Sequence, residues 1–107
     1  MDPNEITEDI TLKNLQNYIH RMITQRGFEK ETVDQTLILL MEELGELAKA
    51  VRKESGMKFS ETTRRTELEE ELADVQIVLL VLADKLGLDM RAAVTAKEHK
   101  NSKRVWK

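Results

Sequence analysis

The chain has 107 residues and a formal net charge of −3, from 17 Lys and Arg against 20 Asp and Glu. This length predicts one domain, and the acidic balance argues against a nucleic-acid partner, because such proteins usually bind through a basic surface. The absence of cysteine excludes disulfides and thiolate metal sites. No apolar run approaches the roughly 18 residues that a bilayer requires, so we expect no membrane partner. The acidic N-terminus has no hydrophobic signal core, which predicts a cytoplasmic protein.

With only four Gly, one Pro and 4% aromatic residues, the composition predicts an all-α fold. Residues 1–10 are polar and predict a flexible N-terminus, and residues 11–107 are expected to form one helical domain. Apolar spacing between residues 12 and 23 predicts the first helix, which Gly27 ends. A second helix is expected from residue 31 or 32 to about 54. Its apolar stripe is Leu37, Leu40, Met41, Leu44, Leu47, Ala48 and Val51.

The start of the third helix is open to two interpretations. Residues 66–69, Thr-Glu-Leu-Glu, read as a capping box, but Ser60 would cap an earlier start. The helix is expected to continue to residue 85 or 86, with Gly87 after its end. Asp89 then caps a fourth helix from Met90 to about residue 100, and a basic tail follows.

Residues 75–83 of the third helix are apolar nearly all round. A surface helix needs only one apolar stripe, so this segment predicts a subunit interface in a dimer or a tetramer. Val81 lies off the main stripe and is expected at that interface. The alternative is a central helix that is buried within a single chain.

Two pairs of acidic residues fall on apolar helix faces. At 100° per residue, Glu43 and Glu46 share the leucine stripe of the second helix, and Glu71 and Asp74 do the same on the third. Like charges three residues apart repel, and burial adds a desolvation cost. No Lys or Arg lies on either stripe within a turn, so a divalent cation between the facing helices is predicted, with Mg²⁺, Mn²⁺ or Ca²⁺ as candidates. A solvated acidic surface is the alternative.

The order of these acids has a known counterpart. Residues 42–46, Glu-Glu-Leu-Gly-Glu, and 71–74, Glu-Leu-Ala-Asp, fit the pattern E-E-x-x-E … E-x-x-D. Residues 97, 101 and 104 supply Lys, Asn and Arg in a downstream basic motif. The chain thereby resembles the MazG-like all-α nucleoside triphosphate pyrophosphohydrolases. That superfamily includes all-α dUTPases, dCTP pyrophosphatases and phosphoribosyl-ATP pyrophosphohydrolases.

The resemblance implies a four-helix-bundle-like fold that assembles as a homodimer or tetramer. It implies Mg²⁺-dependent cleavage of a nucleoside or deoxynucleoside triphosphate to the monophosphate and diphosphate, with Mn²⁺ as a substitute and nucleotide-pool house-cleaning as a role. The implied site residues are Glu43, Glu46, Glu71 and Asp74 as metal ligands, Glu42 as a catalytic residue, and Lys97, Asn101 and Arg104 as phosphate or sugar contacts.

Two other functions stay open. One is a more specialised enzyme, such as a phosphoribosyl-ATP pyrophosphohydrolase. The other is a non-catalytic helical interaction module with a structural metal site. A screen of nucleotides that scores diphosphate release separates the three.

Overall fold

The computed structural model describes the backbone of residues 1–56 and 61–104 and the side chains of residues 1–53 and 65–104. The described chain is all-helical and has no strand, which confirms the predicted class. Short 3₁₀ turns occupy Pro3–Glu5 and Phe28–Lys30. The α-helices are α1 (Leu12–Gln25), α2 (Val33–Gly56), α3 (Glu61–Lys85) and α4 (Met90–Ser102). Within these residues, no helix is both long enough and apolar enough to cross a bilayer.

The predicted helix ends are confirmed at two turns. Gly27 and Gly87 follow α1 and α3 with φ angles of 77° and 70°, which an L side chain rarely adopts. Asp89 caps α4, because its carboxylate accepts a hydrogen bond of 3.2 Å from the backbone N–H of Ala92. These turns set the directions in which α2 and α4 leave their neighbours.

The capping box predicted at residues 66–69 is wrong. The third helix begins at Glu61, so Thr66 lies inside α3. The five residues from 61 to 65 contain neither Gly nor Pro, and nothing in them opposes extension of the helix toward its N-terminus. The alternative cap, Ser60, lies outside the described residues.

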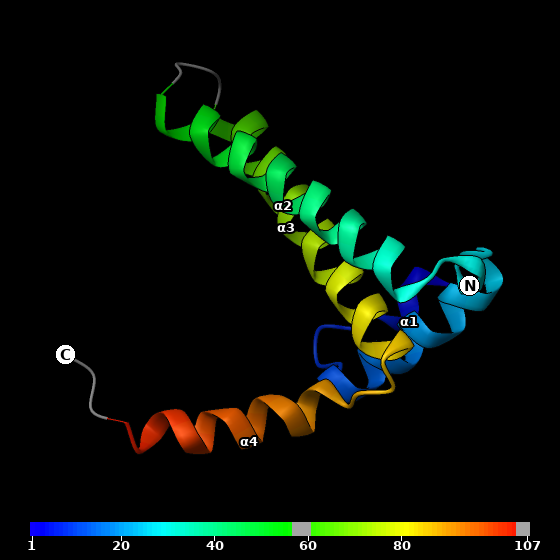
Figure 1. Cartoon of the computed structure of the whole chain (residues 1–107). Coiled ribbons are helices and arrows are strands. Elements are labelled where there is room, and N and C mark those ends of the chain that lie inside the picture. Colours follow the sequence, from blue (N-terminus) through cyan, green and yellow to red (C-terminus); the bar gives the residue numbers. More distant parts are fainter. Residues whose placement is uncertain (57–60, 105–107) are drawn as a thin grey trace.

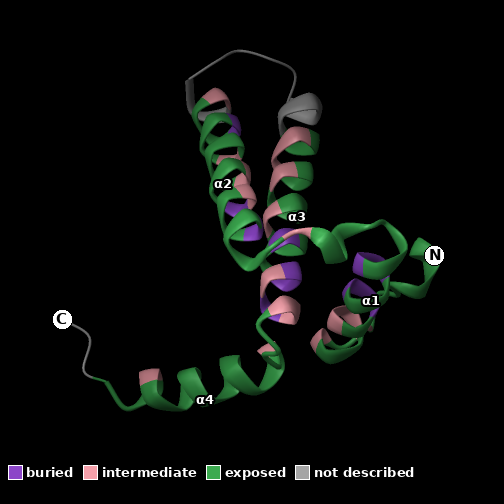
Figure 2. Ribbon diagram, turned by 45° about the vertical axis from the view of Figure 1, so that its right-hand side comes forward, coloured by how far each residue is buried: buried purple, intermediate pink, exposed green. Residues whose placement is uncertain are grey.

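Helices α2 and α3 form a long antiparallel pair, and α1 packs across the base of α3 (Figure 1). Helix α4 contacts α1 and diverges from the α2–α3 pair in both views (Figures 1 and 2). The four helices of the described residues therefore do not pack as one bundle within a single chain, and the expected four-helix-bundle-like arrangement stays a prediction for the oligomer. Figure 2 shows α4 exposed along nearly all of its length.

The core lies where α1 crosses α3. It joins six buried side chains, namely Tyr18, Ile19, Met22, Ile23, Leu80 and Val81. Val81 is only 6% exposed, so its expected place at a subunit interface is wrong. Helix α1 covers Leu80 and Val81 of α3. For these two residues the alternative prediction, a helix that is buried within a single chain, is therefore confirmed.

The apolar stripe of α2 is only partly covered by α3. Leu40 is 9% exposed and Leu47 is half-buried. By contrast, 45–64% of the surface of Leu37, Met41, Leu44 and Val51 is exposed. We call these last four residues the outer α2 face. The apolar stripe of α2 is wide enough to contact two other helices, and within the described residues only α3 packs against it.

Polar contacts fix the base of the molecule. Asp84 of α3 holds the Nδ1 atom of His20 on α1 at 3.0 Å from each of its carboxylate oxygens. The side-chain amide of Gln16 donates to the carbonyl oxygen of Leu88 at 2.6 Å and accepts from the N–H of Met90 at 3.0 Å. Gln16 therefore ties α1 to the turn that aims α4.

Candidate metal centre

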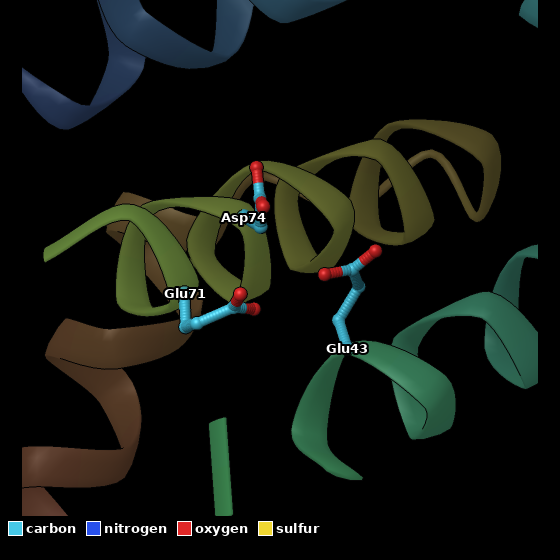
Figure 3. Close-up of side chains that lie close together, drawn as sticks. All are labelled: Glu43, Glu71 and Asp74. Carbon is cyan, nitrogen blue, oxygen red and sulfur yellow. The ribbon is translucent and has the colours of Figure 1, made fainter. Parts of the chain in front are cut away.

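Three carboxylates meet where α2 contacts α3. One oxygen atom from each of Glu43, Glu71 and Asp74 lies within 4.8 Å of the other two. Figure 3 shows the side chain of Glu43 extending from α2 toward the two acids of α3. The juxtaposition predicted from the helical wheel is therefore present for three of the four expected ligands.

Helix packing explains why these acids meet. Leu40 and Leu47 lie one turn to either side of Glu43, and both are turned inward on α2. Val75 and Val78 follow Glu71 on the inward face of α3 in the same way. Because the apolar residues dock one helix on the other, the acids that share their faces are brought to the contact. Glu43 and Glu71 are half-buried there, and Asp74 is exposed.

The electrostatics of this cluster disfavour the ionised form of Glu43 when no cation is bound. Partial burial raises the pKa of Glu43 above its ordinary value, and the negative charges of Asp74, Glu71, Glu46 and Glu42 raise it further. A bound cation would reverse this effect by favouring the ionised form. Carboxylate oxygens are the ligands that Mg²⁺ and Mn²⁺ prefer, so the donor set fits such an ion.

The other two acids of the first motif lie at the edge of the cluster. Glu46 is exposed one turn further along α2, outside the group of three, and Glu42 is also exposed. Both are close enough to Glu43 to raise its pKa. Ligation by Glu46 and a catalytic role for Glu42 stay predictions.

The basic motif is not brought to the acids within the single chain. Lys97, Asn101 and Arg104 lie in the second half of α4 or just after it, and α4 leads away from the α2–α3 pair (Figure 1). Lys97 and Arg104 are exposed, and Asn101 is half-buried. The Oδ1 atom of Asn101 is buried without a hydrogen-bond partner among the described residues, which is uncommon in folded proteins.

A cavity beside the three acids was missed by the sequence reasoning. It measures about 250 Å³ and is lined by Glu46, Lys49, Ala50, Lys53, Glu67, Glu70 and Glu71. We call it the lysine cavity. On the α2 wheel Lys53 lies only 20° from Glu46, but two turns away. The sequence search for positive charges near the acidic pairs covered only one helical turn, and a search over two turns would have found Lys53.

Comparison with known proteins adds independent evidence. Residues 31–106 match the family model of the MazG nucleotide pyrophosphohydrolase domain. The chain is 36% identical over 96 residues to YpjD, an uncharacterized protein of Bacillus subtilis (strain 168). This alignment covers 86% of this chain and 84% of that protein.

Two mammalian relatives match nearly the whole chain. This chain is 29% identical to dCTP pyrophosphatase 1 of Bos taurus and 30% identical to dCTP pyrophosphatase 1 of Rattus norvegicus, over 107 residues in each case. These alignments cover 95% of this chain and 63% of each relative, so the chain spans less than two thirds of their length.

Proposed function

Because the chain belongs to the MazG nucleotide pyrophosphohydrolase family, we propose that it cleaves a nucleoside triphosphate to the monophosphate and diphosphate. The observation that carries this proposal is the meeting of Glu43, Glu71 and Asp74 at the α2–α3 contact. Mg²⁺ is bound in proteins through few carboxylates together with substrate phosphates, which suits a site of this size. Deoxycytidine triphosphate is the first substrate to test, because two relatives carry it in their names. House-cleaning of the nucleotide pool is the role we propose.

The residues divide the chemistry between them. Glu43, Glu71 and Asp74 would hold Mg²⁺ or Mn²⁺, and Glu46 stands one turn away as a fourth ligand. A cation bound there supplies Lewis-acid stabilisation of phosphate charge and lowers the pKa of a bound water. Glu42 accepts a hydrogen bond from the attacking water and orients it. The water oxygen would bond to the α-phosphorus and release one proton to solvent along the hydrogen bond to Glu42, while the bond from that phosphorus to the bridging oxygen breaks and diphosphate leaves with the electron pair.

We also propose that the enzyme is a homodimer or a tetramer built from two dimers. Its accessible surface is 8272 Å² and its mass is 12.4 kDa, whereas a compact monomer of that mass exposes about 6,100 Å². The radius of gyration is 16.3 Å, against about 13 Å for a compact domain of this length. The excess is about 2,000 Å² per chain, or about 4,000 Å² for a pair of chains, which is within the total area of about 2,000–5,000 Å² that obligate homodimer interfaces bury. The outer α2 face is the apolar part of that excess.

Assembly would also explain the basic motif. Helix α4 is exposed and diverges from the acids of its own chain (Figure 2). We propose that α4 of a second copy carries Lys97, Asn101 and Arg104 to the acidic site. There Lys97 and Arg104 would offset phosphate charge, and Asn101 would accept a hydrogen bond from the sugar or from the other subunit.

The experiment that tests the function is a screen of nucleoside and deoxynucleoside triphosphates with Mg²⁺ or Mn²⁺. It scores monophosphate and diphosphate separately from inorganic phosphate. Glu46→Gln and Asp74→Asn should each abolish most turnover, because each removes a charged ligand and keeps the side-chain size. Glu69→Gln is the matched control, since Glu69 is exposed on the other side of α3.

Each outcome of this screen has a consequence. Full activity in the Glu46→Gln and Asp74→Asn variants would overturn the metal-dependent reaction. Loss of activity in Glu69→Gln would show that the register of the site on α3 is wrong. Turnover of no nucleotide by the unmodified protein would favour a helical interaction module with a structural metal site.

A further inference from the structure

The lysine cavity adjoins the metal centre through a shared residue. Glu71 contributes to the cluster of three acids and also lines the cavity. A phosphate chain that began at the three acids would therefore have the cavity next to it. Since a water molecule takes about 30 Å³ in the liquid, a cavity of about 250 Å³ has room for a diphosphate group.

Two positively charged side chains line the cavity, Lys49 and Lys53. Lys49 and Lys53 are one turn apart on α2, where like charges repel and destabilise a helix. Lys53 is half-buried, and Lys49 is exposed. Within residues 1–53 and 65–104, neither ammonium group has a carboxylate oxygen within 4.0 Å, although Glu67 and Glu70 line the same cavity. Two ammonium groups are thus available to an anion beside the metal centre.

We infer that the lysine cavity binds the diphosphate part of the nucleotide, with Lys49 and Lys53 as its phosphate contacts. This inference rests on the proposed function and assigns the direction in which the substrate lies. The α-phosphate is at the three acids, and the β- and γ-phosphates extend along α2 toward Lys53. Lysine binds phosphate as a point charge, which suits a leaving group whose negative charge grows as the bond breaks.

The competing explanation is that the two lysines only balance Glu67 and Glu70 across the helix pair. That explanation predicts a loss of stability in lysine variants and no change in ligand binding. The two explanations therefore differ in what inorganic diphosphate does, which makes this ion the useful probe.

The test measures inhibition of the full-length enzyme by inorganic diphosphate and by nucleoside monophosphate, both in excess Mg²⁺. Lys49→Gln and Lys53→Gln should each weaken diphosphate inhibition by about three- to tenfold. The KM for triphosphate should rise in parallel, and monophosphate inhibition should be unchanged. Lys13→Gln, an exposed lysine on α1 away from the cavity, is the control for loss of one positive charge.

A variant with the opposite sign sharpens the test. Glu70→Gln removes a negative charge from the same cavity and should strengthen diphosphate inhibition by about two- to fivefold. General destabilisation cannot produce effects of opposite sign. Unchanged diphosphate inhibition in both lysine variants, with or without a fall in melting temperature, would overturn the inference.

Titration calorimetry separates this inference from the proposed function. Binding of Mg²⁺-diphosphate to the unmodified protein, weakened in the lysine variants, would support the cavity as a diphosphate site even if no triphosphate were hydrolysed. Hydrolysis without any effect of the lysines on diphosphate binding would uphold the function and overturn the cavity assignment.

Discussion

Replacement of Glu43 by Gln tests the electrostatic account of the metal centre. Glu43 faces Glu71 and Asp74, and one oxygen of each lies within 4.8 Å of the others. The substitution keeps the side-chain size and nearly the same helix propensity, and it removes one of the three charges. We expect the variant to be more stable than the unmodified protein when no divalent cation is present.

The size of this effect follows from Coulomb's law. Two unit charges at 4.8 Å repel by about 0.9 kcal/mol in water and by about 3.5 kcal/mol at an effective dielectric constant of 20. The lower value applies because Glu43 is only half-buried and Asp74 is exposed. Two such pairs give about 2 kcal/mol, which screening at physiological salt reduces to about 1 kcal/mol. For a domain of this size, that gain raises the melting temperature by about 4–8 °C.

The assay is a thermal melt in EDTA and again in Mg²⁺, at one protein concentration throughout. A cation at ten times its dissociation constant stabilises the protein that binds it by about 1.4 kcal/mol. The unmodified protein should therefore gain about as much from Mg²⁺ as Glu43→Gln gains from lost repulsion. Glu43→Gln should gain little from Mg²⁺, because it has lost a ligand.

The pH dependence gives a second check on sign. The pKa of Glu43 is raised in the folded protein, so the folded state binds the proton more tightly than the unfolded state does. Ionisation of Glu43 therefore lowers the stability of the folded state as the pH rises through that pKa. Below about pH 4 the carboxyl is protonated in both states, and this loss of stability is absent. The advantage of Glu43→Gln should be present at pH 7 and vanish near about pH 3.5.

Two results would refute this reasoning. A lower melting temperature for Glu43→Gln in EDTA and low salt would show that the carboxylate is stabilised by some other contact. Equal stabilisation of both proteins by Mg²⁺ would show that Glu43 is not a ligand.

The remaining predictions concern assembly and the core. Leu44→Glu places a charge on the outer α2 face and should convert the oligomer to a monomer, as measured by light scattering at micromolar concentration; an unchanged mass would exclude this face as the interface. Val81→Ala should instead cost about 2 kcal/mol of unfolding free energy in urea, because Val81 is buried in the chain itself. Gln16→Ala should cost about 2 kcal/mol through its two lost hydrogen bonds and speed hydrogen exchange at the N–H of Met90; unchanged protection there would show that Gln16 does not hold the α4 turn.

The helices and their ends could be predicted from the sequence because their causes are local. Gly27 and Gly87 end helices through backbone freedom, and Asp89 caps α4 through a contact three residues away. The wheel placed Glu43 and Glu71 correctly for the same reason. A period of 3.6 residues sets which side chains share a face, and the leucines on that face must find a neighbour.

Only the tertiary structure decided which neighbour each apolar face meets. Val81 and Leu44 are both apolar residues on long helices, and the sequence does not distinguish their surroundings. The first is covered by α1, and the second stays on the outer α2 face. Lys53 and Glu71 are 18 positions apart, yet they line one cavity. Periodicity orders residues around one helix axis, whereas contacts between helices depend on crossing positions that local sequence does not encode.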